Sequence, residues 1–148
     1  MRERTPWSTA ALPAAFIGLV LSGAIHAGAA ASTQDAPSAA EQLAKLRDDG
    51  MVVYGRECAP CHGADGQGDG AGPPLNGATA LANKEHVIKR ILAGTSDGGM
   101  DPFAKVLTDR QVAAVATFVR TSWESTHGVV LEADVKPVRD QLDKDKKK

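Results

Sequence analysis

Aromatic side chains and cysteines are scarce in this sequence. Its 148 residues include three Phe, two Trp, one Tyr and two Cys. The length predicts one ordinary domain and no second one. A small core with so few aromatic rings gains little stability from its own packing, so the composition favours a prosthetic group that the chain packs against.

The sequence also lacks a charge excess of either sign. It has 17 Lys and Arg against 18 Asp and Glu, a formal net charge of −1, and no basic face that would predict binding to nucleic acid. Four lysines gather at the C-terminus, where we expect a solvated tail: Lys144, Lys146, Lys147 and Lys148. No nucleic-acid partner is therefore expected.

Long hydrophobic runs are absent except for one near the N-terminus. Arg2 precedes an apolar stretch from Ala10 to about Ile25, and small residues follow from Ala27 to Ala31. This order is typical of a secretory signal peptide, so residues 1–31 are expected to be removed near Ala27 to Ala31 and the mature chain to be periplasmic. The alternative is an uncleaved membrane anchor, but the run contains Pro13 and falls short of the roughly 20 apolar residues that a spanning helix needs. Membrane association is expected only if the signal stays uncleaved.

The rest of the chain divides into a linker, a domain and an extension. Residues 32–41 are rich in Ala, Ser and Pro without an apolar period, which predicts a disordered linker. Residues 42–124 carry a helical periodicity and form the expected domain. Residues 125–148 have a weaker apolar pattern and are expected to be a C-terminal extension with the Lys-rich tail, containing a short helix begun at Asp134.

Three helices are predicted within the domain, and no βαβ pattern accompanies them. They run over residues 42–57, from the cap residue Asn83 to Ala93, and from the capping box at Thr108 to about Trp123. Their expected apolar stripes are Leu43, Leu46, Val53 and Tyr54; Val87, Ile88, Ile91 and Leu92; and Val112, Val115, Ala116 and Val119. The predicted fold class is all-α, with three to four helices.

Both cysteines belong to one short motif, Cys58-Ala59-Pro60-Cys61-His62, which is the C-x-x-C-H signal for c-type haem attachment. The two thiols can add to the vinyl groups of a haem and form thioethers, and the two-residue spacer matches the separation of those groups. The adjacent His62 then comes under the iron as a proximal ligand. The motif predicts one covalent haem c with its iron.

Other uses of the two thiols are weaker readings. A disulfide closing so small a loop stabilises little, and a thioredoxin-like C-x-x-C would sit near a βαβ pattern, which is absent. A structural zinc site would want four ligands chosen from Cys58, Cys61, His62, His86 and His127.

A second pattern, after the motif, resembles the start of a calcium loop. Asp65, Gln67, Asp69 and Gly70 stand at positions 1, 3, 5 and 6 of an EF-hand-like loop. Position 12 is Asn76 instead of Glu, so we interpret this stretch as an ordinary loop.

From about Gln42 to Trp123 the sequence resembles class I cytochromes c, which are all-α and wrap a few helices around one covalent haem. Gly50, Tyr54 and Cys58 are similar to the family's glycine–aromatic–cysteine ladder on the first helix. The resemblance implies that the small residue allows close contact with the last helix. Val115 and Phe118 match the partner positions there.

Two loops carry the rest of the resemblance. Gly72-Pro73-Pro74-Leu75-Asn76-Gly77 is similar to the family's G-P-x-L-x-G loop, which implies that the Pro73 carbonyl accepts the ring N–H of His62 and fixes its plane. Met100 lies in a G-G-M-x-P-F setting that resembles the distal-ligand loop, which implies a His62/Met100 pair on the iron. The alternatives are that Met100 only fills the core, or that His86 or, less favoured, His127 is the distal ligand.

The resemblance implies one-electron transfer, without catalysis, because a His/Met pair leaves the iron no position for substrate. The expected partners are redox proteins such as a periplasmic dehydrogenase and a terminal oxidase or other acceptor, with the chain as a carrier or an electron-accepting subunit. The alternative is a haem enzyme, or a gas or peroxide sensor, in which Met100 is displaced. A third interpretation is a structural subunit whose haem only stabilises the fold.

Overall fold

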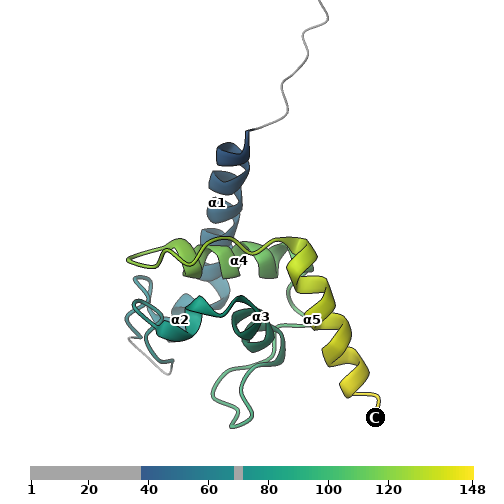
Figure 1. Ribbon diagram of the computed structural model, residues 1–148. Helices are drawn as coiled ribbons and strands as arrows, with labels where there is room; N and C mark the ends of the chain where they lie inside the picture. The colour runs from purple at the N-terminus through teal and green to yellow at the C-terminus, as the bar shows by residue number, and fades with distance from the viewer. Residues whose placement is uncertain (1–37, 69–71) are drawn as a thin grey trace, which may run out of the picture. The chain divides into compact units, whose positions relative to one another are not determined.

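The computed structural model describes residues 38–68 and 72–148 (Figure 1). This part of the chain contains helices and no strand, which confirms the all-α class. The helices are α1 (Ala39–Glu57), α2 (Ala59–His62), the 3-10 helix η1 (Thr79–Ala82), α3 (Lys84–Ala93), α4 (Asp109–Thr121) and α5 (Glu132–Asp145). Among the residues described, no helix is long and apolar enough to cross a membrane. The expected signal peptide and residues 32–37 of the expected linker lie outside the described residues.

Helix α1 begins earlier than the sequence pattern predicted. The Ser38 hydroxyl accepts a hydrogen bond from the Glu41 amide, and the Glu41 carboxylate accepts one from the Ser38 amide. This capping box extends the helix to Ala39, so the last three residues expected in the linker are helical. Because the first turns reach beyond α4 (Figure 1), Leu43 is exposed instead of lying in the predicted stripe.

Helices α1 and α4 meet at Gly50. A Cβ at Gly50 would lie 2.1 Å from the Ala114 carbonyl oxygen and 2.8 Å from the Phe118 Cβ, so no residue with a side chain fits without moving α4. Beside this contact Tyr54, Phe118 and Trp123 pack ring against ring, with centroids 5.2 to 5.8 Å apart. The predicted pairing of Gly50 with Phe118 is confirmed.

Helices α3 and α4 begin at their predicted caps. The Asn83 side chain accepts a hydrogen bond from the His86 amide, and Thr108 and Gln111 form a reciprocal capping box. Both predicted apolar stripes are buried: Val87, Ile88, Ile91 and Leu92 on α3, and Val112, Val115, Ala116 and Val119 on α4.

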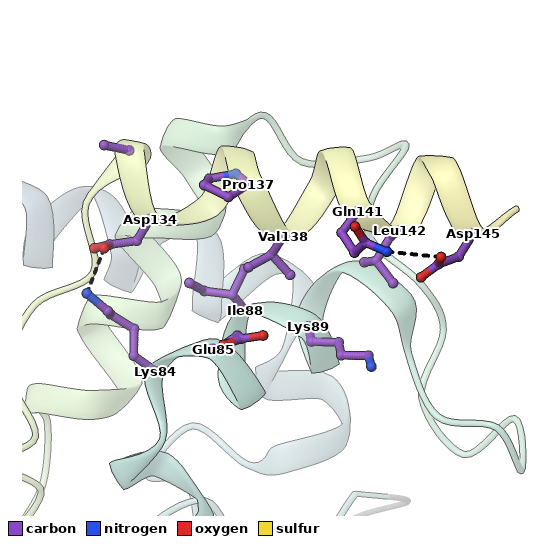
Figure 2. Close-up of a pocket in the computed structure, with 11 residues that line it drawn as sticks. Lys84, Glu85, Ile88, Lys89, Asp134, Pro137, Val138, Gln141, Leu142 and Asp145 are labelled. Atoms are coloured by element: carbon purple, nitrogen blue, oxygen red, sulfur yellow. Dashed lines mark hydrogen bonds and ion pairs between the residues drawn. The ribbon is translucent and has the colours of Figure 1, made fainter.

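Helix α5 is longer than the short helix predicted from Asp134, since it begins at Glu132 and ends at Asp145. Val130, just before it, and Val135, within it, are completely buried. Figure 2 shows α5 lying along α3, with Val138 above Ile88. Both residues line a groove of about 410 Å³ between the two helices. The extension is therefore part of the domain and covers α3 and α4.

Candidate functional site

The C-x-x-C-H motif forms the junction between α1 and α2. Cys58 is both the C-cap of α1 and the N-cap of α2, and its φ and ψ of −114° and −42° are helical. Its amide donates to the Tyr54 carbonyl and its carbonyl accepts from the His62 amide, each at 2.9 Å. Residues at i, i+3 and i+4 of a helical turn share one side, so the structure brings Cys58, Cys61 and His62 together as predicted.

The two cysteines differ in exposure. Cys61 is exposed, whereas Cys58 is half-buried and packs against the core. Burial, helped by the nearby Glu57 and Cys61, raises the pKa of the Cys58 thiol to about 12. In the described ranges, no three His, Cys, Asp or Glu side chains gather to hold a metal ion.

The imidazole of His62 is held by the loop that follows it. Nδ1 of His62 lies 2.8 Å from the Pro73 carbonyl oxygen, and a carbonyl can only accept, so Nδ1 carries the proton. This confirms the predicted contact with Pro73. Within the described residues, the other ring nitrogen, Nε2, makes no hydrogen bond and is not fully enclosed. Nε2 is therefore the nitrogen that can bind a metal, with its basicity raised by the bond at Nδ1.

Backbone bonds fix the loop around this imidazole. The Gly68 amide donates to the His62 carbonyl at 2.8 Å, and the Gly72 amide donates to the Cys61 carbonyl at 3.0 Å. A Cβ at Gly72 would lie 2.8 Å from His62 Nδ1, so only glycine lets the loop approach the ring this closely. Two thiols and an oriented imidazole on one turn, with the loop backbone behind the ring, fit the demands of a covalently attached haem.

Two aromatic residues support the same loop from behind. The Tyr54 hydroxyl donates to the Gly63 carbonyl at 2.6 Å, and the Trp123 ring lies against Gly66. The Gly66 carbonyl in turn accepts from the amides of Leu75 and Asn76, next to Pro73. Sequence reasoning missed this role of Trp123 because it depends on a contact between residues far apart in the chain.

Met100 lies, half-buried, in the loop between α3 and α4. Its amide donates to the Thr95 hydroxyl at 2.9 Å, and its carbonyl accepts from the Thr95 amide at 3.0 Å. These bonds close the loop at Met100, and none of them reaches the C-x-x-C-H turn. Binding of its thioether to iron stays a prediction. Its rivals His86 and His127 are both exposed.

The calcium-like pattern forms an ordinary turn where the structure describes it. The Asp65 carboxylate accepts from the Gln67 amide at 3.1 Å. Asp69 and Gly70 lie outside the described residues.

Comparisons with known proteins agree on one family. The family described as cytochrome c oxidase, cbb3-type, subunit III matches residues 45–119. The fructose dehydrogenase cytochrome subunit of Gluconobacter japonicus is 35% identical over 62% of this chain and 22% of its own length. The Cbb3-type cytochrome c oxidase subunit FixP of Azorhizobium caulinodans is 32% identical over 55% of this chain and 31% of its own. The alcohol dehydrogenase (quinone) cytochrome c subunit of Gluconacetobacter polyoxogenes is 34% identical over 70% of this chain and 26% of its own. The chain thus spans less than a third of the length of each of these relatives.

Proposed function

The chain belongs to the c-type cytochrome family described as cytochrome c oxidase, cbb3-type, subunit III, and from this premise we propose that it binds one covalent haem c and transfers single electrons. Cys58 and Cys61 form the thioethers, His62 Nε2 binds the iron, and Met100 is the distal ligand. The observation that carries this proposal is the 2.8 Å contact between His62 Nδ1 and the Pro73 carbonyl, on the turn that also holds both thiols.

When bound, the haem supplies a one-electron iron couple whose potential depends on its axial ligands, hydrogen bonds and burial. The chain's own residues keep that environment constant. Pro73 holds the proton of His62 at Nδ1 and so fixes the tautomer and the ring plane. With Met100 as the second ligand, the iron keeps no position for substrate, and the thioether raises the reduction potential.

The relatives support a place in a respiratory chain. Their printed names make them cytochrome subunits of a fructose dehydrogenase, an alcohol dehydrogenase (quinone) and a cbb3-type oxidase. This chain acts as an exported carrier or electron-accepting subunit that takes electrons from a periplasmic dehydrogenase and passes them to a terminal oxidase or other acceptor. The exposed Pro60 and Cys61 offer the contact for such partners, which bury less than about 1,200 Å² in transient electron-transfer encounters.

Carbon monoxide tests this assignment against a haem enzyme or gas sensor. The reduced wild-type protein is expected to bind carbon monoxide poorly, whereas Met100→Ala binds it readily and has a lower reduction potential. Met51→Ala is the matched control, because Met51 is 54% exposed on α1 and should leave both properties unchanged. Ready binding by the wild type would favour an open iron site instead.

A further inference from the structure

We propose that Arg139, on helix α5, is a positioning residue that fixes the chain segment following Met100 and thereby keeps the Met100 thioether bound to the iron. The proposal rests on the proposed function, since it assumes the His62/Met100 pair. Helix α5 lies beyond the residues that the family match covers, 45–119, so the match assigns it no role.

The guanidinium of Arg139 makes three contacts at once. Its Nε lies 2.5 Å from the Asp109 carboxylate, its Nη1 donates to the Ala104 carbonyl at 2.5 Å, and its Nη2 donates to the Leu107 carbonyl at 2.9 Å. The side chain is only 20% exposed, so these bonds are partly shielded from water. The planar guanidinium group carries several N–H donors and can therefore make all three contacts at once, which the single ammonium group of a lysine cannot do.

The two carbonyls belong to the segment that connects Met100 to α4. The amide of Phe103 donates to Ile91 at 3.0 Å and the amide of Ala104 donates to Leu92 at 3.3 Å, so one side of this segment is fixed to α3. Arg139 holds the carbonyl side of the same residue, Ala104. Ala104 is four residues from Met100, so a loosened Ala104 gives the Met100 loop more freedom to move away from iron.

Arg139 can fix this segment only if α5 is itself held against the rest of the domain, and two contacts do this. Thr117 on α4 both donates to the Val130 carbonyl at 3.0 Å and accepts from the Val130 amide at 2.9 Å. At the start of α5, Lys84 on α3 lies 2.6 Å from the Asp134 carboxylate (Figure 2). Arg139 therefore ties the Met100 segment to a helix that two other contacts already anchor to the core.

The test compares variants that alter the Arg139 contacts with a variant that breaks the Lys84–Asp134 ion pair near the start of α5. Arg139→Gln removes the charge and the fork, Arg139→Lys keeps the charge beside Asp109, and Asp109→Asn weakens the placement of the guanidinium. Lys84→Gln is the control, because it breaks an α3–α5 ion pair that does not touch the Met100 segment. For each oxidised holoprotein we would measure the charge-transfer band of iron–thioether coordination, the affinity for added imidazole, and thermal unfolding.

We expect Arg139→Gln to bind imidazole about tenfold more tightly than the wild type, since it loses the hydrogen bonds that fix the segment following the competing ligand, Met100. Arg139→Lys and Asp109→Asn should give smaller changes in the same direction. Lys84→Gln should lose thermal stability without changing the imidazole affinity. If Arg139→Gln fails to fold, the other two variants decide.

These measurements distinguish a failure of the proposed function from a failure of the role of Arg139. A wild-type protein without the thioether band would overturn the His62/Met100 assignment and this inference with it. A wild type with the band, whose imidazole affinity changes no more in the Arg139 and Asp109 variants than in Lys84→Gln, would overturn only the role of Arg139.

Discussion

Trp123 lies with its indole ring directly against the backbone of Gly66: a Cβ at Gly66 would be 2.6 Å from Trp123 Cη2. Trp123 has a φ of 54°, in the left-handed region that bulky residues rarely adopt. Such strain persists only where the surrounding packing over-determines it. Here the ring also packs edge-on against Tyr54, at a centroid distance of 5.6 Å, so the strained residue holds the loop that delivers Pro73 to His62.

Gly66→Ala tests this contact. Gly66 and Gly77 have the same φ of +73°, but a Cβ at Gly77 meets nothing within 4 Å. Both alanine variants should lose about 1–2 kcal/mol from left-handed strain, and Gly66→Ala should lose about 1–3 kcal/mol more because it displaces Trp123. Denaturant unfolding of the holoproteins measures both. Equal losses would mean that the ring contact contributes nothing.

Two glycines on α1 test the crossing with α4. Gly50→Ala places a Cβ 2.1 Å from the Ala114 carbonyl oxygen, whereas a Cβ at Gly55 meets no atom within 4 Å. We expect Gly50→Ala to destabilise the protein by about 1–3 kcal/mol through overpacking. Gly55→Ala should stabilise it by about 0.5–1 kcal/mol through helix propensity. A harmless Gly50→Ala in the same unfolding assay would contradict the close approach of the two helices.

Thr117 tests whether the C-terminal extension is part of the domain. Thr117→Val keeps the shape of the side chain but leaves the buried Val130 amide and carbonyl without their partner. Leaving such groups unpaired costs about 1–3 kcal/mol each, so we expect Thr117→Val to lower the free energy of unfolding by at least about 1 kcal/mol. Thr121→Val is the control, because Thr121 is only half-buried and donates to a helix carbonyl. If both variants lose equally little in thermal unfolding, the extension is not anchored at Val130.

The ion pair at the start of α5 predicts a pH dependence. Hydrogen bonds from the Lys84 side chain, and then from the Leu131 amide, lower the pKa of Asp134. A carboxyl whose pKa is lower in the folded state stabilises the fold above its unfolded pKa, about 3.9, and this contribution is lost as pH falls through the lower folded value. The stability gap between the wild type and Asp134→Asn should therefore be full at neutral pH and shrink in acid.

The measurement is thermal unfolding as a function of pH, with Asp143→Asn, exposed on the same helix, as the control. Asp143→Asn should change stability little throughout. A gap for Asp134→Asn that grows on acidification would have the wrong sign and would refute the role of this pair.

Local signals in the sequence predicted most of the fold. The caps Asn83 and Thr108 and the stripes behind them placed α3 and α4, because these signals act within one turn of the chain. The motif from Cys58 to His62 was likewise predicted from residues that are adjacent in the chain. The weak apolar pattern of the C-terminal extension predicted only a short helix from Asp134, whereas α5 continues through Pro137 to Asp145, with Val135 packed against the core.

The parts that sequence reasoning missed depend on long-range contacts. The ring of Trp123 over Gly66 and the three bonds of Arg139 join residues that are far apart in the chain. No spacing rule connects such positions. They carry the supporting structure of the site, whereas the motif itself carries the groups that react.

Covalent attachment of haem at Cys58 and Cys61 is the most direct test of this account. The chain would be produced for export together with a competent cytochrome c maturation system, and its intact mass and visible spectrum measured after extraction with acidified acetone. The wild type is expected to retain the mass of one haem and its colour, and Cys58→Ser/Cys61→Ser to lose both. A colourless wild-type protein with the mass of the polypeptide alone would contradict the account.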